Sequence, residues 1–185
     1  PAPYENPLDD GRRICLGGTI DCVDVYRKYD AIYFRVIDYK SSAKEFSLGD
    51  VRHGINLQML IYLFTLCRPQ DTHPAGVLYV ATAEEKGKPV PDRTGLLLDD
   101  TDILLAMNDE LDPAYLAGIS QKKDGTLTGA ARTDAHELQQ LEEDIRETLR
   151  RIGEDMLAGR ARRTPSEDAC RFCAIRTSCP DAILE

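Results

Sequence analysis

The chain has 185 residues, 42% of them hydrophobic and 30% charged, and this length suits one globular domain with a tail rather than two full domains. No apolar run approaches the roughly 18 residues of a membrane span and no secretory leader opens the chain, so we expect a cytoplasmic protein with no membrane association. The formal net charge of -9 argues against a protein that coats nucleic acid unaided, because non-specific DNA affinity comes largely from Lys and Arg.

The first part of the chain is expected to lead into a β-hairpin. Residues 1–12 contain three prolines and are interpreted as the extended leader of a fragment excised from a larger protein. Residues 17–26 and 31–40 follow strand patterns, and Tyr29 and Asp30 between them indicate a turn. The two strands therefore predict a hairpin.

Helices and one more strand are expected further on. Ser47 is predicted to cap a largely buried helix over residues 51–66, ended by Arg68 and Pro69. The apolar run 76–83 predicts a central strand, and the turn-rich stretch 84–133 is expected to hold one short helix near 100–109. Apolar residues at three- or four-residue spacings predict an amphipathic helix over 135–158, followed by a tail without regular period.

Two acids and a lysine are candidates for a metal-dependent site. Side chains alternate along a strand, so Asp38 and Lys40 share the core-facing row of the second strand, and Asp21 shares a face of the first with apolar neighbours. Mg²⁺ takes one or two carboxylates plus water and substrate phosphate, which Asp21 and Asp38 could supply, while Lys40 could orient the attacking water. A lone D-x-K triplet is short and common, and taken alone it favours a strand-end ion pair of Asp38 with Lys40 and a turn acid at Asp21; the surrounding sequence reverses that preference.

The segments GGTIDCVDVY and FRVIDYKSS resemble the G-x-I-D-x-x-D and V-I-D-Y-K elements of PD-(D/E)XK nuclease domains of the RecB type. The resemblance is strongest to the domain that ends the B subunit of AddAB helicase-nucleases. It implies metal binding by Asp21, Asp38 and the backbone carbonyl of Tyr39, and catalysis by Lys40. Family members often carry a basic residue where this chain has Cys22, which weakens a possible DNA contact and leaves the metal ligands intact.

The same family has a helix with the motif Q-x-x-x-Y, which Gln58 and Tyr62 match in NLQMLIYL. Residues four apart lie on one helical face, so both are predicted to belong to the active site rather than to be satisfied core polars. Asp24 points to the opposite face of its strand from Asp21 and is left out of the site.

Three cysteines in the tail, Cys170, Cys173 and Cys179, have the spacing C-x2-C-x5-C, which suits a shared metal centre. Zinc and iron-sulfur centres usually have four ligands, and only three lie together. The resemblance implies a [4Fe-4S] cluster whose fourth cysteine lies outside this chain. Cys15 is therefore not assigned as a ligand, and a small apolar role suffices for Cys22 and Cys67.

Together these features predict an α/β, restriction-endonuclease-like core with a mixed central sheet flanked by helices, lacking its first helix. The expected units are a leader (1–12), a nuclease core (13–160) and a cysteine-rich iron-sulfur tail (161–185). The expected activity is that of a Mg²⁺-dependent deoxyribonuclease, exonucleolytic on single strands fed by an AddA-type helicase-nuclease partner during double-strand break repair and recombination. The alternatives are a non-catalytic DNA-end-binding module and a stand-alone CRISPR-associated four-cysteine nuclease.

Overall fold

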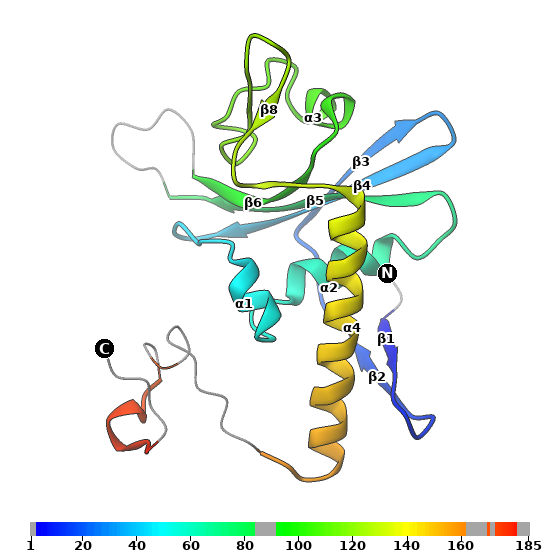
Figure 1. The fold of residues 1–185 in the computed structure, drawn as a ribbon, viewed down its shortest axis with the longest axis vertical. Helices are drawn as coiled ribbons and strands as arrows, with labels where there is room; N and C mark the ends of the chain where they lie inside the picture. Colours follow the sequence, from blue (N-terminus) through cyan, green and yellow to red (C-terminus); the bar gives the residue numbers. More distant parts are fainter. Residues whose placement is uncertain (1–2, 84–91, 162–169, 171–172, 181–185) are drawn as a thin grey trace.

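A mixed five-stranded sheet forms the centre of the molecule (Figure 1). The computed structural model describes residues 3–83, 92–161, 170 and 173–180. Neighbouring strands alternate between antiparallel and parallel pairing across the sheet, which confirms the predicted mixed α/β architecture. In spatial order the strands are β3 (Cys22–Lys28), β4 (Ala31–Lys40), β5 (Thr72–Ala81), β6 (Arg93–Leu98) and β9 (Arg132–Thr133).

Helices cover the sheet on both faces. Helices α1 (Leu48–Arg52), α2 (Gln58–Leu66) and α4 (Ala135–Leu157) lie on one face, and α3 (Thr101–Met107) lies on the other with the small hairpin of β7 (Ser120–Gln121) and β8 (Leu127–Thr128) (Figure 1). The main core fills the space between the sheet and α2 and α4, where Val36, Val77 and Leu60 are buried. The helices thereby fix one face of β4 against α2.

The predicted hairpin is confirmed, although its first strand is shorter than expected. Lys28 pairs with Ala31 across a two-residue turn, in which Tyr29 has a φ of 55°. Strand β3 begins at Cys22 rather than at residue 17, because residues 17–21 leave the sheet and pass close to α2 at Tyr62. Val25 is 53% exposed, which fits the position of β3 at the edge of the described sheet.

The single helix predicted over residues 51–66 is wrong. Helix α1 ends at Arg52 and α2 begins at Gln58, with Gly54 at φ 80° and Asn56 at φ 58° between them. A right-handed helix cannot continue through positive φ values, so the chain turns here. The predicted cap is confirmed, since the Ser47 side chain accepts a hydrogen bond from the backbone N–H of Asp50 at 3.1 Å.

Residues 4–16 form a hairpin, which differs from the extended leader expected over residues 1–12. Strand β1 (Tyr4–Pro7) pairs with β2 (Arg13–Leu16), and Tyr4 is only 1% exposed. The hairpin packs on α4, where Gly153 leaves room for the side chains of Ile14 and Leu8. The start of the chain thus joins the main core.

Most of the remaining predictions hold. Strand β5 overlaps the strand predicted over 76–83 but starts earlier, at Thr72, and ends at Ala81, and α3 and α4 lie where they are expected. Strand β6 falls in the stretch expected to be loop-rich, so that expectation is wrong there. In the tail the structure describes a short 3-10 turn (Arg176–Ser178), while residues 162–169, 171–172 and 181–185 lie outside the described part. Within the described residues, no helix combines the length and apolar character needed to cross a membrane.

Candidate active site

Asp38 and Lys40 lie together at the end of β4. Val36, on the same face of the strand, is buried in the main core at 1% exposure, while the side chains of Asp38 and Lys40 are 18% and 32% exposed. The ammonium nitrogen of Lys40 is 2.5 Å from Oδ2 of Asp38. The apolar row of β4 therefore ends in a partly buried ion pair at the rim of the core.

Asp21 lies next to this pair, in the bend just before β3. Cys22 pairs with Ile37 across the hairpin, so the next step outward brings Asp21 level with Asp38. The Asp21 side chain is exposed, contrary to the expected apolar surroundings, and its Oδ2 accepts a hydrogen bond from the backbone N–H of Tyr39 at 3.1 Å. Asp21 is thus hydrogen-bonded to the backbone between Asp38 and Lys40, and of the two carboxylates only that of Asp38 contacts the lysine.

Gln58 and Tyr62 share one face of α2, as the four-residue spacing predicts. The Gln58 amide donates a hydrogen bond to the Tyr62 hydroxyl at 2.9 Å. The same hydroxyl lies so close to Gly18 that a Cβ atom there would be 2.0 Å away. Tyr62 therefore supports the segment that leads into Asp21, which connects α2 to the acid-bearing loop.

Two further residues, Tyr79 and Lys44, belong to the site and were missed in the sequence. Tyr79 of β5 pairs with Asp38 in the parallel register, and its ring centroid is 5.7 Å from the Lys40 ammonium and 4.5 Å from that of Lys44. Burial raises the pKa of Tyr79, and Asp38 adds to the rise. Burial lowers the pKa of Lys44, and Lys40 lowers it further. The sequence signal for Tyr79 was an aromatic residue with a polar hydroxyl in the strand predicted at the centre of the sheet. No feature of the sequence distinguishes Lys44 from other lysines.

Asp24 and Cys22 are on the other side of the hairpin. Asp24 pairs with Arg35 across the strands, and the Arg35 guanidinium is 2.5 Å from its Oδ2. Cys22 packs against the small cluster that contains Ile37, on the face opposite Val36. The Asp24 carboxylate is therefore neutralised by Arg35 and is not part of the site of Asp21 and Asp38.

The donor set at the strand ends fits a hard divalent cation. The carboxylates of Asp21 and Asp38 and the backbone carbonyl of Tyr39 are oxygen donors, the type that Mg²⁺ prefers, with water and phosphate completing its octahedron. Across the described ranges, no three His, Cys, Asp or Glu side chains group as metal ligands, the cysteines of the tail included. These few protein ligands suit a cation such as Mg²⁺, which leaves most of its coordination positions to water and substrate.

The described part of the cysteine tail is tightly turned. The backbone N–H of Cys173 donates to the carbonyl of Cys170 at 3.2 Å, and that of Arg176 donates to the carbonyl of Cys173 at 3.2 Å. Cys170 is buried, Cys173 is exposed and Cys179 is partly buried. Successive turns thus keep the described part of the tail short, but the side chains of the three cysteines do not group as metal ligands in it.

Cys67 has properties unsuited to a metal ligand. Burial, followed by the charge of Glu142, raises its pKa to about 12, so its thiol stays protonated at neutral pH. Metal ligation requires the thiolate. The small apolar role expected for Cys67 agrees with this environment.

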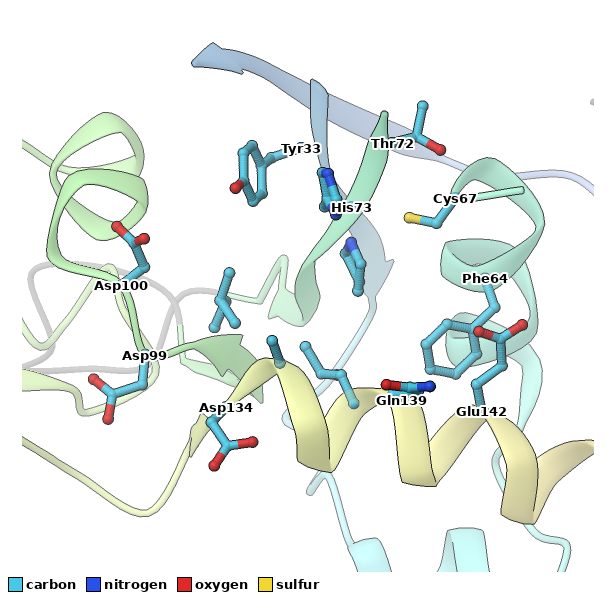
Figure 2. A pocket seen from close by; sticks show the side chains of 14 residues that line it. Tyr33, Phe64, Cys67, Thr72, His73, Asp99, Asp100, Asp134, Gln139 and Glu142 are labelled. Carbon is cyan, nitrogen blue, oxygen red and sulfur yellow. The ribbon is translucent and has the colours of Figure 1, made fainter. Parts of the chain in front are cut away.

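A cavity of about 510 Å³ opens at the opposite end of the sheet (Figure 2). Its lining includes Tyr33 and Thr72, near the starts of β4 and β5, and several acids at the helix starts. Asp99 pairs with Arg132 at 2.6 Å, and Asp100 and Asp134 cap α3 and α4. Since these acids have structural partners and would repel phosphate, this cavity is not a nucleic-acid site.

Comparison with protein families identifies the class of this fold and site. Residues 1–180 match the model of the PD-(D/E)XK nuclease superfamily. The chain belongs to this superfamily, and its mixed sheet with flanking helices is the fold expected from the sequence.

Curated relatives are more specific. Three relatives are named as the B subunit of an ATP-dependent helicase/deoxyribonuclease. Their identity to this chain is 35% for the protein from Symbiobacterium thermophilum, 33% for that from Thermoanaerobacter sp. (strain X514) and 30% for that from Alkaliphilus oremlandii. Each alignment covers 96% of this chain and 17% or 18% of the relative. The chain therefore spans less than a fifth of the length of these relatives.

Proposed function

We propose that this chain is a metal-dependent deoxyribonuclease domain that hydrolyses phosphodiester bonds where β3 begins and β4 ends. The observation that carries the proposal is the convergence at the end of β4, where the Tyr39 N–H donates to Asp21 at 3.1 Å and Lys40 contacts Asp38 at 2.5 Å. A divalent cation and a polyanionic substrate would give these two carboxylates and the lysine a common purpose.

Each residue has a distinct role in this proposal. Asp21, Asp38 and the carbonyl of Tyr39 would hold Mg²⁺, which when bound lowers the pKa of a water ligand and polarises the phosphate. Lys40 would orient the attacking water and stabilise the charge that develops on phosphorus. Tyr62 positions the Asp21 loop through its contact at Gly18, and Gln58 holds the Tyr62 hydroxyl.

The substrate and partner follow from the relatives and from the charge of the chain. We infer that the domain cleaves single-stranded DNA exonucleolytically, as part of a helicase-nuclease with an AddA-type subunit that acts in double-strand break repair and recombination in the cytoplasm. The relatives are named as helicase/deoxyribonuclease subunits. A net charge of -9 gives weak intrinsic affinity for DNA, so delivery of the strand by a motor would compensate.

The tail would stabilise the domain through a [4Fe-4S] cluster held by Cys170, Cys173 and Cys179, with a fourth cysteine from beyond this chain. The C-x2-C-x5-C spacing supports the proposal, and the three thiols, which do not group as metal ligands in the described part of the tail, would have to come together around the cluster. Full-length protein purified without oxygen should be brown and contain iron and sulfide, and Cys173→Ala should abolish the colour. Colourless protein with stoichiometric zinc would contradict the cluster.

The decisive experiment on catalysis compares two aspartates of the same hairpin. In the full-length complex, with the partner subunit's nuclease inactivated, Asp38→Asn should reduce cleavage of single-stranded oligonucleotides more than about 100-fold, because metal charge stabilisation is worth several kcal/mol. Asp24→Asn makes the same chemical change on the opposite face and should cleave normally. Normal cleavage by Asp38→Asn would refute the catalytic role and favour a DNA-binding module without catalysis.

A further inference from the structure

Lys44 is held in a fixed position beside the proposed active site by elements distant in sequence. It follows β4, and its backbone carbonyl accepts a hydrogen bond from the Thr94 hydroxyl of β6. Its ammonium lies 3.0 Å from Oδ1 of Asn56, in the turn between α1 and α2, and 4.5 Å from the Tyr79 ring centroid. One contact thus fixes the backbone of Lys44, and two others order its long side chain.

The charge of Lys44 has no direct counter-ion in the described part of the chain. Lys40 has an ion pair with Asp38, whereas the partners of Lys44 are the neutral Asn56 amide and the Tyr79 ring. The nearby carboxylate of Asp50 instead accepts a hydrogen bond from Nδ2 of Asn56 at 2.8 Å. A partly buried ammonium without a carboxylate partner favours the approach of an anion.

Two ammonium groups approach the same ring. Lys40 and Lys44 are 5.7 Å and 4.5 Å from the Tyr79 centroid, and Tyr79 is in register with Asp38. The second cation is therefore next to the proposed cleavage centre and not on a remote surface. Burial and then Lys40 lower the pKa of Lys44, and the charges of Asp38 and Asp50 offset this only in part.

We propose that Lys44 is a DNA-binding residue that contacts a non-bridging oxygen of a backbone phosphate next to the scissile one. This inference rests on the proposed nuclease function and adds a substrate contact to it. Asn56 acts as a positioning residue, since its side chain bridges Lys44 and Asp50 from the left-handed turn at φ 58°. A phosphate that is not cleaved is bound similarly before and during reaction, so Lys44 contributes to affinity rather than to the chemical step.

The test is steady-state cleavage of a single-stranded oligonucleotide by the same full-length complex in Mg²⁺. Lys44→Gln should raise KM about tenfold or more with kcat nearly unchanged, the pattern for loss of a charged contact used equally in ground and transition states. The slope of log(kcat/KM) against log salt should become shallower by about 0.7, the value for one phosphate on a single strand. Lys44→Arg should retain the original slope.

Lys122→Gln is the matched control, because it removes the same charge from an exposed residue next to the β7–β8 turn. It should leave KM and the salt slope unchanged. Urea unfolding shows whether each variant is folded. Asn56→Asp is a second test, because it keeps Lys44 and gives its ammonium a carboxylate partner. It should also raise KM and flatten the salt slope.

Three results separate the possible outcomes. An unchanged KM and salt slope in folded Lys44→Gln, while Asp38→Asn abolishes cleavage, would overturn the phosphate contact and leave the nuclease proposal intact. A lower kcat at constant KM and salt slope would also overturn it, since Lys44 would then be only structural or positioning. Normal cleavage by Asp38→Asn would instead reject the nuclease proposal on which this inference rests.

Discussion

Gly18 occupies a place where no side chain fits, and this gives a sharp test of how α2 supports the acid-bearing loop. A methyl group at Gly18 would lie 2.0 Å from the Tyr62 hydroxyl and 2.9 Å from its ring carbon Cζ, whereas non-bonded carbons pack at about 3.5–4.0 Å. Gly18→Ala must displace either residues 17–21 or Tyr62, whose hydroxyl accepts a hydrogen bond from Gln58. We expect the free energy of unfolding to fall by about 1–3 kcal/mol, the usual range for overpacking.

Urea unfolding measures this effect, with the neighbouring Gly17→Ala as control. No heavy atom lies within 4 Å of a methyl group added at Gly17, so its stability should change by less than about 0.5 kcal/mol. In a Tyr62→Ala background the clash disappears, and Gly18→Ala should then cost little. Cleavage should also fall in Gly18→Ala and not in Gly17→Ala, because displacement of this segment moves Asp21. An undiminished cost in the Tyr62→Ala background would refute the reasoning.

Cys67 and Asp134 provide further measurable outcomes. Burial raises the pKa of Cys67 to about 12 from its ordinary value of 9.0, so iodoacetamide at pH 9 should label exposed Cys15 and spare Cys67 until the chain unfolds. A raised folded pKa gives stability that is complete below pH 9 and is lost as the pH rises toward 12, so Cys67→Ala should lose less stability over this window. Asp134→Ala removes the capping box of α4, in which Asp134 accepts from the Glu137 N–H at 2.7 Å, and should cost about 1 kcal/mol in urea unfolding. Asp144→Ala, on the exposed side of the same helix, should cost much less.

Local periodicity predicts the elements whose burial pattern is regular. Helix α4 buries residues at three- and four-residue spacings, so its existence follows from sequence. The hairpin follows instead from two runs of strand-forming residues on either side of a turn, because β4 has no alternating burial pattern. Because side chains alternate along a strand, Asp38 and Lys40 are expected on the same face of β4 as Val36. The structure adds the ion pair and the level position of Asp21, which depend on pairing between strands.

Glycines account for two of the wrong predictions. Gly54 has a positive φ and breaks the helix expected over residues 51–66, whereas the apolar pattern alone favours a continuous helix. Gly95 resembles a turn signal in the sequence, yet it lies inside β6. A glycine is needed there because a Cβ atom would be 2.1 Å from the carbonyl oxygen of Val77. One glycine serves a turn and the other a close strand approach, and only the three-dimensional partner distinguishes them.

The hairpin of β1 and β2 and the environment of Lys44 depend on partners that are far away in sequence. The hairpin is buried against α4, more than a hundred residues later, and Asn6 donates a hydrogen bond to the Arg146 carbonyl at 2.9 Å. The position of the Lys44 side chain depends on its contacts with Asn56 and Tyr79. Neither environment leaves a periodic signal in the segment itself.

The distribution of charge explains how an acidic chain could act on a polyanion. Asp24 is neutralised by Arg35 on the far face of the hairpin, which leaves the formal charges of Asp21, Asp38, Lys40 and Lys44 in balance around the proposed centre. On our proposal, a bound divalent cation would convert this neutral cluster into a positive one at the position of the phosphate, while the rest of the chain stays acidic. Affinity for DNA would then be confined to the metal-loaded site and to the strand delivered to it, so a net charge of -9 would restrict where DNA binds without preventing its cleavage.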